Sequence, residues 1–164
     1  MKLVFLDMDG VVVTAKSHSV FDEDEQGIWW SPDPIAIQAL NNLVYAHDVK
    51  FVLSSTWRIV HGFKKTVDHL RENGLIDQFI GETPNAHYAC RGEEIQEFLR
   101  ALKEQGSEIT DYLILDDNSD MLPEQEDHFI KTDCFEGMTY KNILDIRDFF
   151  DRHAEKESGG ANGG

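Results

Sequence analysis

Three short, mainly apolar runs of this chain each end in a cluster of polar residues. The runs are Lys2–Leu6, Phe51–Leu53 and Tyr112–Leu115, and the clusters that follow them are DMDG, SST and DDNSD. Runs of this length between polar residues are typical of buried strands in a parallel sheet. The carboxyl ends of such strands lie along one edge, where ligands bind. The pattern therefore predicts that the three polar clusters meet at one edge of a sheet.

Segments with helical periodicity separate these runs. The sequence SPDP gives one clear helix start, with Asp33 as the cap and Pro34 at the first helical position. Alternating strands and helices predict an α/β fold, a Rossmann-like, doubly wound parallel sheet with right-handed crossovers. Helices are expected at residues 34–46, 57–73, 93–105 and 140–152, and two further short strands at residues 79–80 and 129–130.

The length of 164 residues predicts one domain, which we place at residues 1–153. Residues 154–164 are polar and rich in glycine, and we expect them to form a disordered tail. No apolar run approaches the ~18–20 residues of a membrane span, and the start MKLVFLDMDG is too short in apolar residues for a signal peptide. These features predict a cytoplasmic protein. Cys90 and Cys134 lie far apart, which argues against a disulfide scaffold or a cysteine zinc site.

The chain is strongly acidic. It has 31 Asp and Glu residues against 15 Lys and Arg residues, a formal net charge of −16. Such a charge repels nucleic-acid backbones and anionic membranes at long range. Screening limits that repulsion to about 8 Å at physiological salt, so a local basic spot can still bind a phosphate.

The polar clusters also indicate a chemistry. Asp7, Asp9, Asp116 and Asp117 would bring several carboxylates to one sheet edge, and such close like charges need a cation. Oxygen ligands suit Mg²⁺, and the Ser54 hydroxyl with a positive side chain would complete a phosphoryl-binding site. A calcium-binding EF-hand loop is not expected, since no ligating Glu stands at its twelfth position.

The segments LVFLDMDGVV, FVLSS and LILDDNSD resemble the first, second and fourth motifs of the haloacid dehalogenase superfamily of phosphohydrolases. The resemblance runs from Leu3 to about Phe150. It implies a Mg²⁺-dependent phosphomonoester hydrolase that acts through an aspartyl-phosphate. In that scheme Asp7 is the nucleophile and Asp9 is the general acid and base.

The resemblance also implies the roles of the remaining residues. Ser54 and the backbone of Ser55 would bind the phosphate. The metal would be held by Asp7, Asp9 through its carbonyl, Asp116 and Asp117.

The third motif of the superfamily is a single Lys or Arg. We assign it to Arg91, at the start of the helix before the last motif, with Lys64 and Lys65 as alternatives. Arg58, in the first turn after Ser54 and Ser55, is expected to contact substrate.

The order SSTWR, RGEEI and ILDD further resembles a branch of the superfamily found in nucleic-acid-repair and phage-type proteins. The resemblance implies a polynucleotide 3′-phosphatase. A small-molecule phosphatase for nucleotides or sugars and an inactive binding module are the alternatives. The expected partner is a phosphorylated substrate rather than a membrane.

The spacing between motifs leaves no room for a cap domain. The segment after the first motif holds a flap at residues 14–30 with Trp29 and Trp30, and one helix. We therefore expect an open site. In this superfamily, capless members act on large substrates or close the site by oligomerising.

Overall fold

Five parallel strands form one sheet in the order β3-β2-β1-β4-β5. The computed structural model describes residues 1–17, 31–85 and 89–159, with side chains up to residue 152. The strands are β1 (Lys2–Leu6), β2 (Val49–Leu53), β3 (Phe79–Glu82), β4 (Asp111–Asp116) and β5 (Phe129–Lys131). The helices are α2 (Pro34–His47), α3 (Trp57–Val60), α4 (Phe63–Glu72), α5 (Arg91–Glu104), the 3₁₀ helix η1 (Pro123–His128) and α6 (Tyr140–Gly159).

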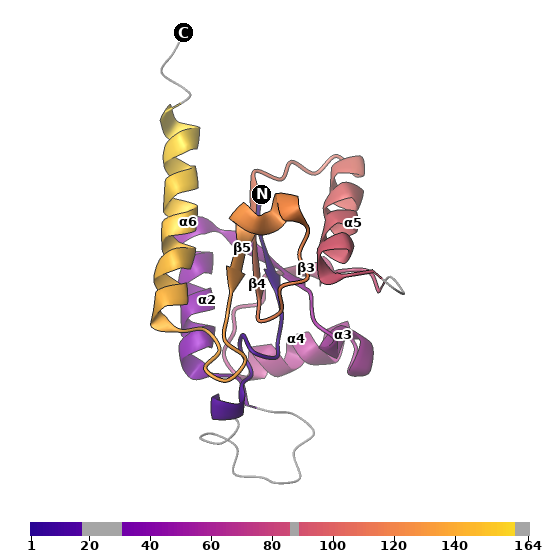
Figure 1. The fold of residues 1–164 in the computed structure, drawn as a ribbon, viewed down its shortest axis with the longest axis vertical. Helices are drawn as coiled ribbons and strands as arrows, with labels where there is room; N and C mark the ends of the chain where they lie inside the picture. Colours follow the sequence, from indigo (N-terminus) through magenta and orange to yellow (C-terminus); the bar gives the residue numbers. More distant parts are fainter. Residues whose placement is uncertain (18–30, 86–88, 160–164) are drawn as a thin grey trace.

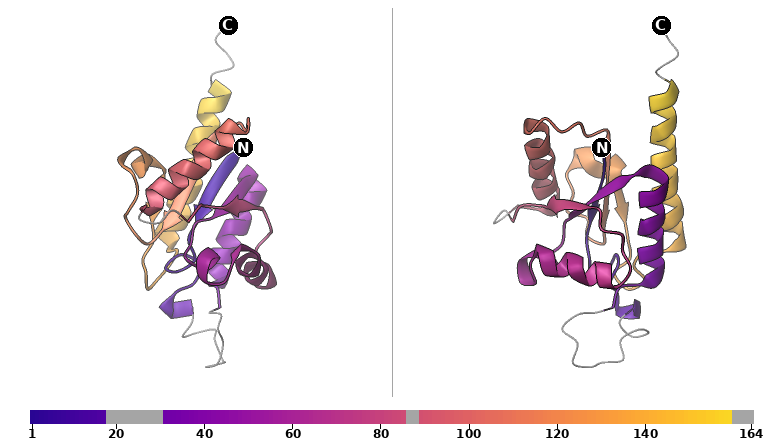
Figure 2. Two further views of the ribbon diagram at one scale, coloured as in Figure 1. Left: turned by 90° about the vertical axis from the view of Figure 1, so that its right-hand side faces the viewer. Right: turned by 180° about the vertical axis from the view of Figure 1, so that it is seen from behind.

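Helices cover both faces of this sheet, as Figures 1 and 2 show: α2 and α6 lie on one side and α5 on the other. Alternate strand residues supply the two cores, because successive side chains of a strand point to opposite faces. Val4 and Leu6 pack with α2 and α6, whereas Leu3 and Phe5 pack under α5. The predicted α/β fold with a doubly wound parallel sheet is confirmed.

The central strand β1 lies between β2 and β4, where the direction of winding reverses. In register, Leu6 pairs with Leu53 on one side and with Leu115 on the other. The backbone continues this pairing one step further: Ser54 N–H donates to Leu6 O (2.9 Å), and Asp7 N–H donates to Leu115 O (3.0 Å). The ends of the three strands are therefore level, and the three polar clusters meet as predicted.

The helix expected over residues 57–73 is divided in two. The first part, α3, ends at Val60, and α4 begins at Phe63. Gly62 lies between them with a φ of 87°, which a helix cannot contain and which only glycine adopts without strain. The apolar residues keep the same helical spacing on both sides of Gly62, so the sequence pattern alone predicts one continuous helix.

The last helix is longer than expected. It continues to Gly159, although a disordered tail was expected from residue 154. In Figure 1 its upper part projects beyond the sheet. No helix in the described part of the chain is both long and apolar enough to cross a membrane.

The absence of a cap stays a prediction, because residues 18–30, including Trp29 and Trp30 of the expected flap, lie outside the described residues. Over residues 54–85, which the structure describes throughout, the elements are α3, α4 and β3. Both α4 and β3 belong to the sheet and its covering layer, since Leu70 and Phe79 pack into the core under α2.

The break at Gly62 can be tested by whether Gly62→Ala lowers or raises the free energy of unfolding. A methyl group at this position would meet no atom within 4 Å, so only the backbone conformation matters. Gly62→Ala should destabilise the protein by about 1–2 kcal/mol because of the positive φ. In a continuous helix the same change would stabilise it by about 1 kcal/mol. Urea unfolding monitored by circular dichroism decides between the two.

Candidate active site

Two buried carboxylates form the centre of the site. Asp7 follows β1 and is 6% exposed, and Asp116 ends β4 and is 1% exposed. Each is oriented by a backbone donor: Met8 N–H donates to Asp7 Oδ1 (2.7 Å), and Asn118 N–H donates to Asp116 Oδ1 (2.9 Å). The second oxygen of each carboxylate is left for other partners.

Asp117 joins this pair because Gly10 makes room for it. Gly10 has a φ of 69°, and a methyl group built there would lie 2.3 Å from Asp117 Oδ2. Thr132 Oγ1–H donates to Gly10 O (2.6 Å) and holds the turn against the residues that follow β5. Any other residue at position 10 would strain the backbone and displace the carboxylate.

This group of carboxylates fits a divalent cation. One oxygen from each of Asp7, Asp116 and Asp117 lies within 4.8 Å of the others. Asp116 Oδ2 is buried and accepts no hydrogen bond among the described residues, so a ligand position is available there. A set of hard oxygen donors with carboxylate charge matches Mg²⁺ rather than a softer metal.

The pKa values of the two buried carboxyls reflect the same crowding. Burial, with the charge of Asp116, raises the pKa of Asp7 from 3.8 to about 7, although Arg91 opposes the rise. Burial also raises the pKa of Asp116, to about 6, with Asp117 and Asp120 adding to the effect and Arg91 opposing it. A bound cation would favour the ionised forms of both groups.

Arg91 is the cation that the structure places among these groups. Its Nη2 lies 3.9 Å from Asp7 Oδ2, its Nε lies 3.5 Å from Asp116 Oδ2, and its Nη1 lies 3.5 Å from Ser54 Oγ. Of the three residues considered for the third motif, only Arg91 reaches the carboxylates. Lys64 is exposed on α4 and pairs with Asp68 (2.5 Å), and Lys65 is exposed on the same helix.

The start of α5 fixes the position of Arg91. Its backbone N–H donates to Asp120 Oδ2 (3.1 Å), and the next N–H, of Gly92, donates to Asp120 O (3.2 Å). Gly92 is pressed against the residues before η1, since a methyl group there would lie 2.5 Å from Leu122 N. The Gln125 side chain donates to Gly92 O (2.9 Å) from the same side.

The two serines after β2 are both buried, with Ser54 2% exposed and Ser55 0%. Ser54 Oγ faces Arg91, the place expected of a phosphate-binding hydroxyl. The Ser55 hydroxyl has two other tasks: it hydrogen-bonds the Asp7 carboxylate and lowers its pKa, and it accepts a hydrogen bond from Trp57 N–H (3.3 Å). The prediction that Ser55 binds the phosphate concerns its backbone, and this use of its hydroxyl does not conflict with it.

Asp9 stands apart from the group of three carboxylates. The residue as a whole is exposed, but its carboxyl is partly buried where Trp57 Nε1–H donates to Oδ2 (2.9 Å). Burial of the carboxyl raises the pKa of Asp9, against the effect of the Trp57 hydrogen bond. The sequence did not reveal this role of Trp57, because a helix start shows where the residue is and not where its indole points.

Arg58 does not stand where the sequence placed it. Its side chain is 3% exposed, and its guanidinium donates four hydrogen bonds within the protein. The acceptors are the backbone carbonyls of Ser55, Thr83 and Pro84 and the carboxylate of Glu94, the last at 2.6 Å. The geometry thus gives Arg58 a positioning role between α3 and α5 instead of the expected contact with substrate.

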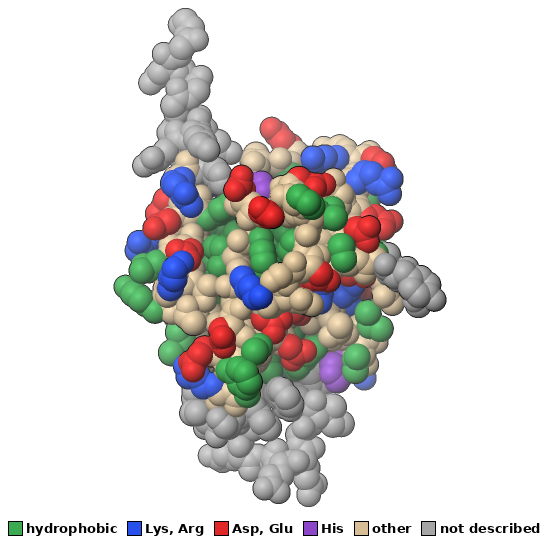
Figure 3. Space-filling view, in the orientation of Figure 1, with side chains coloured by type: hydrophobic (Ala, Val, Ile, Leu, Met, Phe, Trp, Pro, Cys, Tyr) green, Lys and Arg blue, Asp and Glu red, His purple; other side chains and the backbone are tan. Residues whose placement is uncertain are grey.

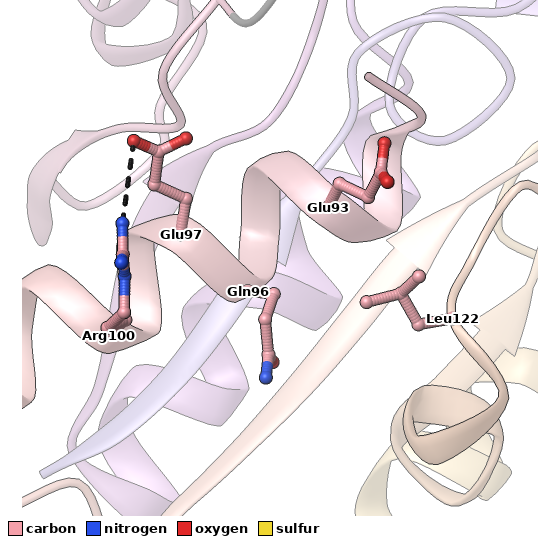
Figure 4. Close-up of a pocket in the computed structure, with 5 residues that line it drawn as sticks. All are labelled: Glu93, Gln96, Glu97, Arg100 and Leu122. Atoms are coloured by element: carbon pink, nitrogen blue, oxygen red, sulfur yellow. Dashed lines mark ion pairs between the residues drawn. The ribbon is translucent and has the colours of Figure 1, made fainter.

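Acidic side chains gather on the surface near the carboxyl ends of β4 and β5, as the space-filling view shows (Figure 3). A separate hollow of about 190 Å³ lies along α5, where Figure 4 shows its lining. There Arg100 pairs with Glu97 (4.0 Å), and none of the predicted site residues takes part. The chemistry predicted from the sequence therefore belongs to the sheet edge and not to this hollow.

Comparison with known proteins identifies the family. The family model described as the HAD domain in Swiss Army Knife RNA repair proteins matches residues 3–143. The chain belongs to this family. Among solved structures, the chain is similar to D,D-heptose 1.7-bisphosphate phosphatase from B. bronchiseptica, complexed with magnesium and phosphate. That likeness has 20% sequence identity and a TM-score of 0.44, and it covers 73% of this chain and 72% of the other.

The search of curated proteins found no match to this chain. The predicted membership of the haloacid dehalogenase superfamily is confirmed by the family match, and with it a domain of the phosphatase type. Neither comparison identifies the substrate of this chain.

The positioning role of Arg58 has a measurable consequence. Arg58→Met removes the cation beside Glu94, which is 7% exposed, and should destabilise the HAD domain by about 3–5 kcal/mol. The double variant Arg58→Met, Glu94→Gln should recover part of that loss, because the buried charge is then gone. Urea unfolding of the single and double variants measures both effects. A substrate-binding arginine would instead leave stability unchanged and raise KM.

The raised pKa values predict how stability depends on pH without a metal. The folded protein holds a proton on Asp7 up to about pH 7, whereas the unfolded chain releases it near pH 3.8. This contribution to stability is present at low pH and is lost as the pH rises through that window. Tm in chelator should therefore fall between about pH 4 and pH 7, and Mg²⁺ should restore it at the upper end.

Asp7→Asn is the control for this pH dependence. Without the titrating carboxyl, the fall in Tm should be shallower and the gain from Mg²⁺ smaller. An unchanged slope in Asp7→Asn would assign the pH dependence to other groups.

Proposed function

We propose that this HAD domain is a Mg²⁺-dependent phosphomonoester hydrolase that removes the 3′-phosphate from RNA ends through an aspartyl-phosphate on Asp7. The observation that carries the proposal is the position of Arg91, which contacts Asp7, Asp116 and Ser54 at once. A phosphoryl group bound between Arg91 and Ser54 would lie beside the free oxygen of Asp7. Phosphoryl transfer depends mainly on such positioning and on neutralisation of charge.

In the first step, Asp7 Oδ2 attacks phosphorus, and the bond from phosphorus to the ester oxygen breaks. Asp7 Oδ1 is held by Met8 N–H (2.7 Å), which fixes the carboxylate for attack by its other oxygen. Asp9, whose pKa is raised by burial, gives its proton to the leaving oxygen. Mg²⁺ held by Asp7, Asp116 and Asp117 would offset negative charge on the phosphoryl group.

In the second step, Asp9 takes a proton from water, and the water oxygen attacks the phosphorus of the aspartyl-phosphate. The bond from phosphorus to Asp7 breaks, and inorganic phosphate leaves. The Trp57 indole holds the Asp9 carboxylate in one position for both proton transfers. Arg91 and Ser54 keep the phosphoryl group in place between the steps.

Two observations favour an RNA end over a small molecule. The matching family is described by its occurrence in RNA repair proteins. In addition, apolar side chains are exposed on both sides of the site: Ile59 (51%) and Val60 (72%) on α3, and Phe135 (68%) in the turn after β5. That turn contacts the residues after Asp9, since Met138 N–H donates to Val11 O (3.3 Å). Exposed apolar surface beside a phosphate site suits a substrate that extends beyond its phosphate.

The test is turnover of three esters: an aryl phosphate, a nucleoside 3′-phosphate and a 3′-phosphorylated oligoribonucleotide. The wild-type protein with Mg²⁺ should hydrolyse all three, with the highest kcat/KM for the oligonucleotide. Equal or better turnover of the nucleotide would favour a small-molecule phosphatase. No turnover of any ester would favour an inactive binding module.

Asp7→Asn should reduce kcat by at least about 10³-fold, because the covalent step has no nucleophile. Asp77→Asn, an exposed carboxyl before β3 and at the opposite edge, is the matched control and should keep full activity. Chelator should abolish wild-type turnover. Activity of Asp7→Asn within tenfold of wild type would contradict the mechanism.

A further inference from the structure

Lys131 is a cation at the same sheet edge that the proposed mechanism does not use. It is the last residue of β5 and lies in register with Asp116, the last residue of β4. Adjacent strands are about 4.8 Å apart, so its backbone is one strand away from the buried carboxylate. Its side chain is exposed to solvent.

The alternation of side chains along β5 places Lys131 on the α5 side of the sheet. Ile130 packs with the core under α2 and α6, and Phe129 packs with the core under α5. Lys131, two residues after Phe129, therefore points to the same side as Phe129. Arg91 begins α5 on that side, so both cations lie on the α5 side of the sheet: Arg91 Nε lies 3.5 Å from Asp116 Oδ2, and Lys131 is one strand away from Asp116.

The ammonium group of Lys131 is available for an anion. Its one side-chain partner among the described residues is Ser119 Oγ (2.7 Å), and it forms no ion pair there. Other cations near this edge are engaged: Arg58 with Glu94 (2.6 Å) and Lys16 with Glu136 (3.1 Å). In a chain of net charge −16, an unneutralised cation beside a phosphate site is a place where a second negative group of the substrate can bind.

We propose that Lys131 binds the phosphoryl group on the 5′ side of the terminal nucleotide whose 3′-phosphate is hydrolysed. The inference rests on the proposed function and adds to it a residue that selects substrates by a second phosphate. That second phosphate belongs either to the next linkage of a strand or to a nucleoside 3′,5′-bisphosphate. The flexible stem and point charge of lysine suit an exposed phosphate oxygen.

Lys131 could instead act only through Ser119, by holding the loop between Asp117 and Asp120. The two roles differ in their effect on a substrate with one phosphate. Loss of a loop support would displace Asp117 and impair hydrolysis of every ester. Loss of a phosphate contact would impair only substrates that carry the second phosphate.

The experiment compares kcat/KM of wild type and Lys131→Met with four substrates. They are a nucleoside 3′-phosphate, a nucleoside 3′,5′-bisphosphate, a 3′-phosphorylated dinucleotide, and the same dinucleotide with a neutral methylphosphonate linkage. The last two differ by one charge at the position in question. Lys131→Arg tests rescue by charge, and Lys103→Met, at the far end of α5 from Arg91, removes an exposed lysine away from the site.

We expect Lys131→Met to lower kcat/KM roughly 3- to 10-fold for the normal dinucleotide and to change neither the nucleoside 3′-phosphate nor the methylphosphonate. Lys131→Met should also make kcat/KM for the normal dinucleotide less sensitive to salt, because one screened charge contact is lost. If kcat/KM also falls for the nucleoside 3′,5′-bisphosphate, a terminal 5′-phosphate is enough for the contact with Lys131. If it falls only for the dinucleotide, Lys131 recognises the phosphate of a linkage within a strand.

Equal losses with all four substrates, or no loss with any, would overturn the inference while leaving the phosphatase activity in place. No hydrolysis by the wild-type protein would overturn the proposed function itself. Lys103→Met should match wild type throughout.

Discussion

Repulsion among the carboxylates at the carboxyl ends of β1 and β4 is the constraint around which this molecule is arranged. Asp7 and Asp116 are both buried, and burial raises both pKa values; the charge of Asp116 adds to the rise at Asp7, and the charge of Asp117 adds to the rise at Asp116. A sheet edge would not hold such a group without compensation. Arg91 supplies one positive charge, and the remaining ligand position at Asp116 Oδ2 is suited to a metal. The catalytic potential of the site and its cost in stability have the same origin.

The elements around the site hold Arg91 in place. The pair formed by Arg58 and Glu94 joins α3 to α5, one helical turn from Arg91. Removal of one partner from a buried ion pair destabilises a protein strongly, whereas replacement of both partners by apolar residues is often neutral. Its value here is therefore geometric, because it fixes α5 relative to Ser54. Asp120 and Gln125 do the same from the side of β4.

The sheet and the meeting of the three polar clusters could be predicted because they follow from strand register, which depends on the apolar runs. Arg91 could be assigned as the positive residue of the third motif because it stands at the start of the helix that precedes the last motif, and the structure places it beside the carboxylates. The direction of side chains could not be predicted in the same way. Arg58 and Trp57 are neighbours on one helical turn, and only the packed structure shows the guanidinium turned inward to Glu94 and the indole turned toward Asp9. The break at Gly62 was hidden because apolar periodicity is the same in two short helices as in a long one.

Charge balance at the site also accounts for how so acidic a protein can bind a phosphate. The three carboxylates of Asp7, Asp116 and Asp117 exceed the single charge of Arg91 by two, which is the charge of one Mg²⁺ ion. With the metal bound, the centre is neutral and no longer repels a phosphoryl dianion. Without it, every carboxylate of the group that is ionised would repel a phosphate at close range, where screening by salt has little effect. A bound cation would therefore favour phosphate binding at this centre, whereas the acidic surface beyond the Debye length has little influence there.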